Sequence, residues 1–162
     1  MSVSPHRLSI SIKLPKIATE GEAFALTYEV KNTGGSDFPG GALNVIMSWP
    51  AIGSAMFVGH PLTVEPLGPG EVWTSHEFRE TPIMTGYTVF TPANIPFRAN
   101  DGRAIELYLA DGATLSQNRP IGAIRARSHE EISQKQAGQI AVVFLVVVAI
   151  FERANLTVAL LK

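Results

Sequence analysis

The 162-residue sequence contains no cysteine. Disulfide frameworks, thiolate zinc sites and cysteine nucleophiles are therefore excluded, because each of them needs a thiol. Charged residues make up only 17% of the chain, which is below the roughly 25% of ordinary soluble domains, and the formal net charge is −1. The basic residues form neither a run nor a stripe. We therefore expect no nucleic acid among the partners.

The motifs of common enzymes are missing as well. No G-x-S-x-G elbow is present, and no glycine-rich phosphate loop leads from a strand into a helix. The glycine-rich segment NTGGSDFPGG joins two predicted strands, so it lacks the helix N-terminus that would bind phosphate. We expect a protein that is not an enzyme and that holds no cofactor. An active site that no motif reveals is the alternative.

Candidate metal ligands are sparse. No histidine has a second histidine or a carboxylate at the usual ligand spacing; the four histidines are His6, His60, His76 and His129. His76, Glu77 and Glu80 are close enough in sequence to offer a few ligands at one strand end, but a solvated strand edge explains them better. Asp101 and Asp111 each precede a glycine, and turn chemistry accounts for both pairs without calcium. We expect no metal site.

Apolar and polar residues alternate with a period of two through most of the first 127 residues. LSISIKL and AFALTYEV are the clearest examples. Such alternation predicts strands with one buried and one wetter face. Clusters of Gly, Pro, Asn and Asp separate the segments, and this pattern predicts an all-β fold, an antiparallel β-sandwich or barrel. Further strands are expected over 42–49, 61–67, 71–78, 86–91, 104–110 and 121–127.

Two local signals are sharper than the rest. The pair AIELYLA-DG-ATLSQ predicts a hairpin, because Asp-Gly suits a type I′ turn. At Ser128 the character of the sequence changes, and S-H-E-E predicts a helix cap in which Ser128 and Glu131 form a capping box. We expect a helix from about residue 129, polar at first and apolar after Gly138. The predicted domains are thus 1–127 and 128–162.

The segment from Glu20 to Phe78 has a recognisable pattern. A strand ends in V-x-N-x-G, a loop of small residues follows, and L-x-P-G-E precedes the next strand. The matching residues are Val30, Asn32, Gly34, Leu67, Pro69, Gly70 and Glu71. This pattern resembles the CARDB-type and related Ig-like β-sandwich modules of bacteria and archaea. The resemblance implies an Ig-like sandwich that acts as a spacer, an adhesion module or an adaptor, and it names no activity.

The chain departs from that family in two ways. Modules of the family are usually exported, whereas MSVSPHRLSISIKLPK has neither an apolar core nor a cleavage site of a signal peptide. Residues 84–127 extend past the resemblance, so we expect one or two added strands.

The longest apolar run lies at the C-terminus, in QIAVVFLVVVAIFERANLTVALLK. Residues 138–161 would form about 36 Å of helix. A helix that is apolar on all sides lies in lipid or is wrapped by protein, and a small sandwich cannot wrap it. A membrane anchor is therefore favoured over a soluble oligomer held together by C-terminal helices. The residues expected to contact lipid or a partner are Ile140, Val143, Phe144, Val147, Phe151, Glu152 and Arg153.

Glu152 and Arg153 interrupt this run. They mark either the far membrane interface or a polar contact with neighbouring helices in a complex. The positive-inside bias and the absence of a signal peptide predict a tail-anchored, single-pass protein with a cytoplasmic N-terminal domain. If Met1 is not the native start, an extracytoplasmic domain is the alternative.

These features together predict a non-enzymatic, membrane-anchored, Ig-like binding or adaptor module that mediates protein–protein interaction. Protein partners, self-association and membrane lipid are the expected contacts. An accessory subunit of a larger membrane complex and the soluble oligomer are the alternatives. Trp49, Trp73 and Phe57 are candidate surface aromatics of a binding face, although burial of all three against the sandwich core or under the helix is the more common outcome for such residues.

Overall fold

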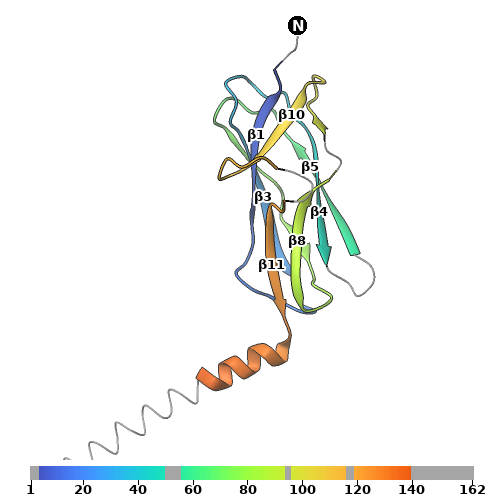
Figure 1. Cartoon of the computed structure of the whole chain (residues 1–162), viewed down its shortest axis with the longest axis vertical. Helices are drawn as coiled ribbons and strands as arrows, with labels where there is room; N and C mark the ends of the chain where they lie inside the picture. Colours follow the sequence, from blue (N-terminus) through green and yellow to red (C-terminus); the bar gives the residue numbers. More distant parts are fainter. Residues whose placement is uncertain (1–3, 50–55, 94–95, 116–118, 140–162) are drawn as a thin grey trace, which may run out of the picture. The chain divides into compact units, whose positions relative to one another are not determined.

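The computed structural model describes residues 4–49, 56–93, 96–115 and 119–139 (Figure 1). The contacts between Cα atoms divide the chain into two compact units, Met1–Ala126 and Arg127–Lys162. The first unit consists of strands, and the described part of the second begins with a helix over residues 129–139.

Eleven strands are described. All the predicted segments contain strand, but the one over 71–78 is divided into two strands, and the short β2 and β9 were not predicted. The strands are β1 (His6–Lys13), β2 (Ala18–Thr19), β3 (Phe24–Asn32), β4 (Gly41–Trp49), β5 (Met56–Val64), β6 (Val72–Thr74), β7 (Phe78–Glu80), β8 (Gly86–Pro92), β9 (Phe97–Arg98), β10 (Ala104–Leu109) and β11 (Gly122–Arg127).

The strands form two sheets, which confirms the predicted all-β class. A six-stranded sheet has the order β6-β3-β1-β10-β9, with β7 also paired to β3, and a five-stranded sheet has the order β2-β11-β8-β4-β5. In Figure 1, β1 lies beside β10, and β8 lies beside β4. The prediction of purely antiparallel sheets is wrong, because β1 and β10 are parallel, in the register His6↔Ile105 to Ile10↔Leu109. Parallel neighbours need a long crossover connection, and eight intervening strands supply it here.

The core lies between the two sheets. Strands β3 and β4 each bury every second residue, as the alternation predicted. The largest fully buried side chains include Tyr28, Phe38, Met47 and Phe90. Burying an apolar side chain of this size contributes about 1.5–3 kcal/mol. The alternate residues of each strand face outward, and their side chains form the two outer surfaces of the sandwich.

The predicted hairpin after β10 is present, but its loop has three residues rather than two. The Leu109 N–H donates to the Ala113 carbonyl at 2.8 Å, and the Gly112 N–H donates back to the Leu109 carbonyl at 2.8 Å. Gly112 has a φ of +84°, a left-handed conformation that favours glycine. Asp111 accepts the Ala113 N–H with its side chain at 3.0 Å, so turn chemistry explains this aspartate.

The predicted helix cap is also present. The Glu131 N–H donates to the Ser128 Oγ at 3.2 Å, and the helix runs over 129–139 in the described residues. Glu130 and Glu131 lie in its first turn, where the helix dipole favours negative charge. These eleven helical residues extend for about 16 Å.

The predicted membrane anchor is contradicted. Within residues 4–49, 56–93, 96–115 and 119–139, the structure has no helix that combines the length and apolar character needed to cross a membrane. The described helical residues, 129–139, are mostly polar. The prediction of a single-pass location, with its tail-anchored orientation and cytoplasmic domain, is therefore corrected. Residues 140–162, where most of the predicted span falls, lie outside the described residues.

Gly40 offers a test of the turn that leads into β4. Its φ is +88°, and a Cβ added there would lie 3.0 Å from the Val64 carbonyl oxygen. Gly35 lies in the same loop, and a Cβ added there would have no neighbour within 4 Å. We expect Gly40→Ala to lower the free energy of unfolding by about 1–3 kcal/mol, and Gly35→Ala to change it by less than about 0.5 kcal/mol. Urea denaturation measures both, and equal effects would contradict this account of the turn.

Candidate protein-binding face

The side chains that point away from the core form one outer face on each sheet. We call the outer face of the five-stranded sheet the β4 face, after the long strand β4, which pairs with both β5 and β8. Its positions follow from the alternation of burial along β4, β5, β8 and β11 and from the pairing of these strands. They are Ala42, Asn44, Ile46, Ser48, Phe57, Gly59, Pro61, Thr63, Tyr87, Val89, Thr91, Ala123 and Arg125.

The register of the strands arranges these residues in rows. Ala123, Val89, Ser48 and Phe57 are successive partners across four strands and form one row. Thr91, Ile46 and Gly59 form the next row. With strands about 4.8 Å apart and a rise of about 3.3 Å per residue, the β4 face measures about 15 Å by 30 Å. The rows thus make one continuous surface.

The β4 face carries almost no charge. Its charged residues in the described strands are confined to β11, where Arg125 points outward and Arg127 ends the strand. The outer face of the six-stranded sheet is different, with two ion pairs, Arg7–Glu106 and Lys13–Glu29. Its outward charged residues are Arg7, Lys13, Glu29, Lys31, Arg79, Arg98 and Glu106. Charge depletion is typical of the centre of protein–protein interfaces.

Two aromatic side chains are exposed on the β4 face. Phe57, on β5, is 65% exposed, and Tyr87, on β8, is 60% exposed. Phe57 was among the predicted candidates, whereas Tyr87 was not. Trp49 is 5% exposed and belongs to the core, and Trp73 is half-buried and packs against it. The tryptophans therefore contribute little to the surface, and the exposed aromatics are a phenylalanine and a tyrosine.

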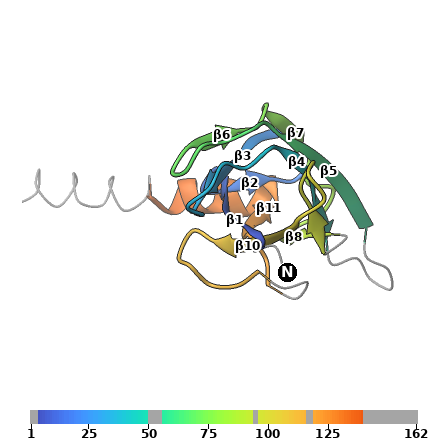
Figure 2. The same ribbon diagram turned by 90° about the horizontal axis from the view of Figure 1, so that it is seen from above.

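Strand β5 lies at the edge of its sheet (Figure 2). The Asn44 carbonyl accepts a hydrogen bond from the Ala93 N–H at 2.9 Å, on the β8 side of β4. The backbone N–H and C=O of Asn44 therefore point toward β8, and Asn44 and its β5 partner Pro61 form a non-hydrogen-bonded pair. The nitrogen of Pro61 consequently faces the outer edge, where it has no proton to donate. An added strand would lose a bond at the middle of β5, so the edge discourages strand pairing.

A buried polar chain links the two sheets. The Tyr28 hydroxyl on β3 lies 2.7 Å from Nδ1 of His60 on β5, and Nε2 of His60 lies 2.8 Å from Oε1 of Glu80 on β7. Because a carboxylate only accepts, Nε2–H donates to Glu80, and Nδ1 accepts the Tyr28 proton. Burial, and then the charge of Glu80, raise the pKa of Tyr28 above its ordinary range. His60 is 1% exposed, so this chain is sealed from ligands and acts as a structural link.

A second polar cluster fixes the loop between β9 and β10. Oδ2 of Asp101 lies 3.0 Å from the His6 Nε2 and 2.6 Å from the Arg103 Nε. The hydrogen bond from His6, followed by the contacts with Arg103, holds the pKa of Asp101 well below its usual range. The side chain of Asp101 also accepts the Arg103 N–H at 3.0 Å, as expected of a turn aspartate. The cluster therefore joins β1 to the loop that precedes its parallel partner, β10.

The residues weighed as metal ligands do not converge. Glu77 pairs with Arg79 at 2.9 Å, Glu80 pairs with His60, and the His76 ring packs against Phe78 with centroids 4.2 Å apart. In the part of the chain that the structure describes, no group of three or more potential metal ligands is found.

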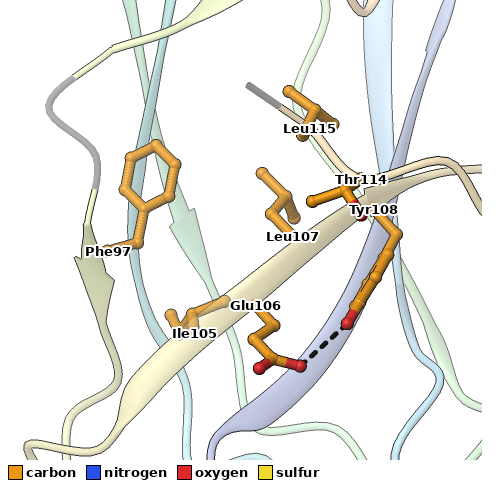
Figure 3. A pocket seen from close by; sticks show the side chains of 7 residues that line it. All are labelled: Phe97, Ile105, Glu106, Leu107, Tyr108, Thr114 and Leu115. Atoms are coloured by element: carbon orange, nitrogen blue, oxygen red, sulfur yellow. Dashed lines mark hydrogen bonds between the residues drawn. The ribbon is translucent and has the colours of Figure 1, made fainter. Parts of the chain in front are cut away.

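A small pocket lies beside β10 (Figure 3). Its volume is about 240 Å³, below the roughly 300–1,000 Å³ of typical ligand sites. Phe97, Leu107 and Leu115 form apolar walls, and Glu106 accepts a hydrogen bond from the Tyr108 hydroxyl at 2.8 Å. This bond raises the pKa of Tyr108. Glu106 also pairs with Arg7, so the pocket offers no uncommitted carboxylate for chemistry.

The chain is similar to two solved structures of a CARDB domain. A crystal structure of the CARDB domain of the PF1109 protein from Pyrococcus furiosus, in complex with di-metal ions, shares 18% identity with a TM-score of 0.47 and covers 78% of this chain and 93% of its own. A solution NMR structure of the same domain shares 19% identity with a TM-score of 0.44 and covers 74% and 93%. The predicted CARDB-type resemblance is confirmed. No family model and no curated protein matches the chain.

The confirmation of a CARDB-type module does not extend to the C-terminal helix. The residues predicted to contact lipid or a partner there lie outside the described residues. They are Ile140, Val143, Phe144, Val147, Phe151, Glu152 and Arg153.

The polar chain through the core predicts a pH-dependent effect of Tyr28→Phe. Loss of the hydroxyl leaves Nδ1 of His60 buried without its donor, so at pH 7 we expect a loss of about 1–3 kcal/mol in the free energy of unfolding. Above pH ~10 the wild-type unfolded state releases the Tyr28 proton while the folded state keeps it, so wild-type stability falls. The difference between the two proteins should therefore shrink as pH rises. Urea denaturation from pH 7 to 11 tests this, and a constant difference would contradict it.

Proposed function

We propose that this CARDB-type β-sandwich is a protein-interaction module without enzymatic activity, and that the β4 face is its binding surface. The observation that carries the proposal is the contrast between the two outer faces. One is covered by charged side chains and ion pairs, as a surface in permanent contact with water usually is. The other exposes Phe57 and Tyr87, and its charge in the described strands lies on β11 alone. A partner that covers this face removes apolar surface from water and leaves few charges to desolvate.

The size of the β4 face sets the strength of the interaction. Its projected area is about 450 Å², and part of this area is polar, because Asn44, Ser48, Thr63, Thr91 and Arg125 belong to the face. It is smaller than the roughly 800 Å² per partner of a stable complex. The expected interaction is therefore reversible, with a dissociation constant in the micromolar range or weaker. Such affinity suits an adaptor that exchanges partners.

Other features support a role without catalysis. The Tyr28–His60–Glu80 chain has the order of a proton relay, but its hydroxyl and imidazole are buried where no substrate reaches them. The pocket beside β10 is small, and its carboxylate is engaged by Arg7 and Tyr108. Binding through a sheet face needs neither site.

Two matched substitutions test the binding surface. Phe57 and Val72 are both exposed apolar residues, at 65% and 52%, but they lie on different sheets. We expect Phe57→Lys to lower the recovery of interacting proteins from a cell extract at least tenfold, because it places a charge at the interface. Val72→Lys, which makes the same change on the six-stranded sheet, should leave recovery unchanged.

Quantitative mass spectrometry of proteins retained on the immobilised full-length chain measures this effect. Thermal denaturation of each variant confirms that folding is intact, which is expected for exposed sites. Only proteins whose recovery differs between the two variants count. Equal recovery with both variants would show that the β4 face is not the binding surface.

A further inference from the structure

We infer that the β4 face binds a second copy of this chain, so that two five-stranded sheets pack face to face. This inference rests on the proposed function and names its partner. Face-to-face packing of sheets at about 10 Å is a common way to bury two apolar faces, and it is the arrangement that already holds the two sheets of each copy together.

Charge selects the β4 face for self-association. In a two-fold symmetric pair, each copy contributes the same surface, so a face with net charge meets its own sign. The strands of the six-stranded sheet present five basic and two acidic residues outward; they are Arg7, Lys13, Lys31, Arg79, Arg98, Glu29 and Glu106. Glu77 neutralises Arg79, and the remaining excess of positive charge would make this face repel a second copy of itself. The β4 face carries its charge on β11 alone. It can therefore meet itself without repulsion over most of its area.

The strand order suggests how two copies fit. A two-fold axis parallel to the strands places β11 of one copy over β5 of the other, because these strands lie on opposite sides of β8 and β4. Phe57 and Ala123 belong to the same row, so the large side chain of one copy lies over the small side chain of the other. The two Arg125 side chains then lie at opposite edges, roughly 14 Å or more apart.

Edge-to-edge pairing of β5 is the other route to a symmetric dimer, and Pro61 opposes it. The nitrogen of Pro61, which carries no proton, faces the free edge at the middle of β5, as the hydrogen bond from the Ala93 N–H to the Asn44 carbonyl shows. Strand addition would leave a gap in the ladder there. The face is therefore the better surface for a second copy.

The area of the β4 face predicts a weak dimer. Two copies would bury about 900 Å² in total, which is less than the roughly 1,200–2,000 Å² of standard stable interfaces. We expect dimers at high micromolar concentrations and above, and monomers at low micromolar concentrations. The experiment must therefore trap the pair at high concentration.

The absence of cysteine makes a site-specific trap possible, because a single introduced cysteine is the only thiol in the chain. Thr91 lies on β8 in the central rows of the β4 face, and its Cα would lie roughly 11 Å from that of the second copy. Ser11 is its counterpart on β1, in the middle of the six-stranded sheet. Both residues are half-buried and face outward.

We expect full-length Thr91→Cys, treated with a bis-maleimide that spans about 11 Å, to form a covalent dimer whose yield rises with protein concentration. Ser11→Cys should give a yield of covalent dimer at least tenfold lower. Adding Phe57→Lys to Thr91→Cys should reduce the yield at least fivefold, whereas adding Val72→Lys should not. Ser48→Cys, on β4 beside Val89, serves as a second reporter position if Thr91→Cys fails to fold.

Two outcomes would overturn the inference. Equal yields from Thr91→Cys and Ser11→Cys, insensitive to Phe57→Lys, would show that the copies associate elsewhere, as in the alternative of an oligomer held together by C-terminal helices. No cross-linking at millimolar concentration from either reporter position would show that the face takes no second copy. In the second case, a difference between Phe57→Lys and Val72→Lys in protein capture would still uphold the proposed function, with a different protein as the partner.

Discussion

The constraint on which the structure depends is the single core shared by two sheets. Every long strand must turn alternate side chains into that core, and β3 and β4 do so along their whole length. The Tyr28–His60–Glu80 chain adds a polar connection across the same core. Since half of each strand is committed in this way, the remaining half forms two flat surfaces. These two surfaces differ in charge, so the two outer faces of the sandwich are chemically distinct.

The distribution of charge on the two outer faces, the proline in the edge strand β5 and the area of the β4 face all support the same proposal. The six-stranded sheet keeps its outer face compatible with water through ion pairs such as Arg7–Glu106. The described strands of the five-stranded sheet carry charge only on β11, and the sheet exposes Phe57 and Tyr87. Pro61 discourages edge-on pairing at β5, so contact with another protein is directed to the face. A face of this size would give the reversible association that the proposed role of an interaction module requires.

Much of the fold was predictable from the sequence, because period-2 alternation and turn chemistry are local properties. The division of the segment 71–78 was not, because the Ser75 side chain takes one of the two ladder bonds. The Ser75 N–H still donates to the Tyr28 carbonyl at 2.9 Å, but the Tyr28 N–H donates to the Ser75 Oγ at 2.9 Å, and this hydroxyl donates to the His76 carbonyl at 2.7 Å. The parallel pairing of β1 with β10 joins residues almost a hundred positions apart. The β4 face shared this difficulty. Phe57 was a candidate surface aromatic, but only the strand order and register show that it shares one face with Ile46.

Oxidative footprinting by hydroxyl radicals tests the central claim most directly, because it reports the accessibility of each aromatic side chain in the full-length protein. The protein would be labelled at low micromolar and at millimolar concentration, with Tyr108 on the six-stranded sheet as an internal reference. The account predicts that Phe57 and Tyr87 become at least twofold less reactive at the higher concentration, while Tyr108 does not change. Protection of Tyr108 with unchanged Phe57 and Tyr87 would contradict it.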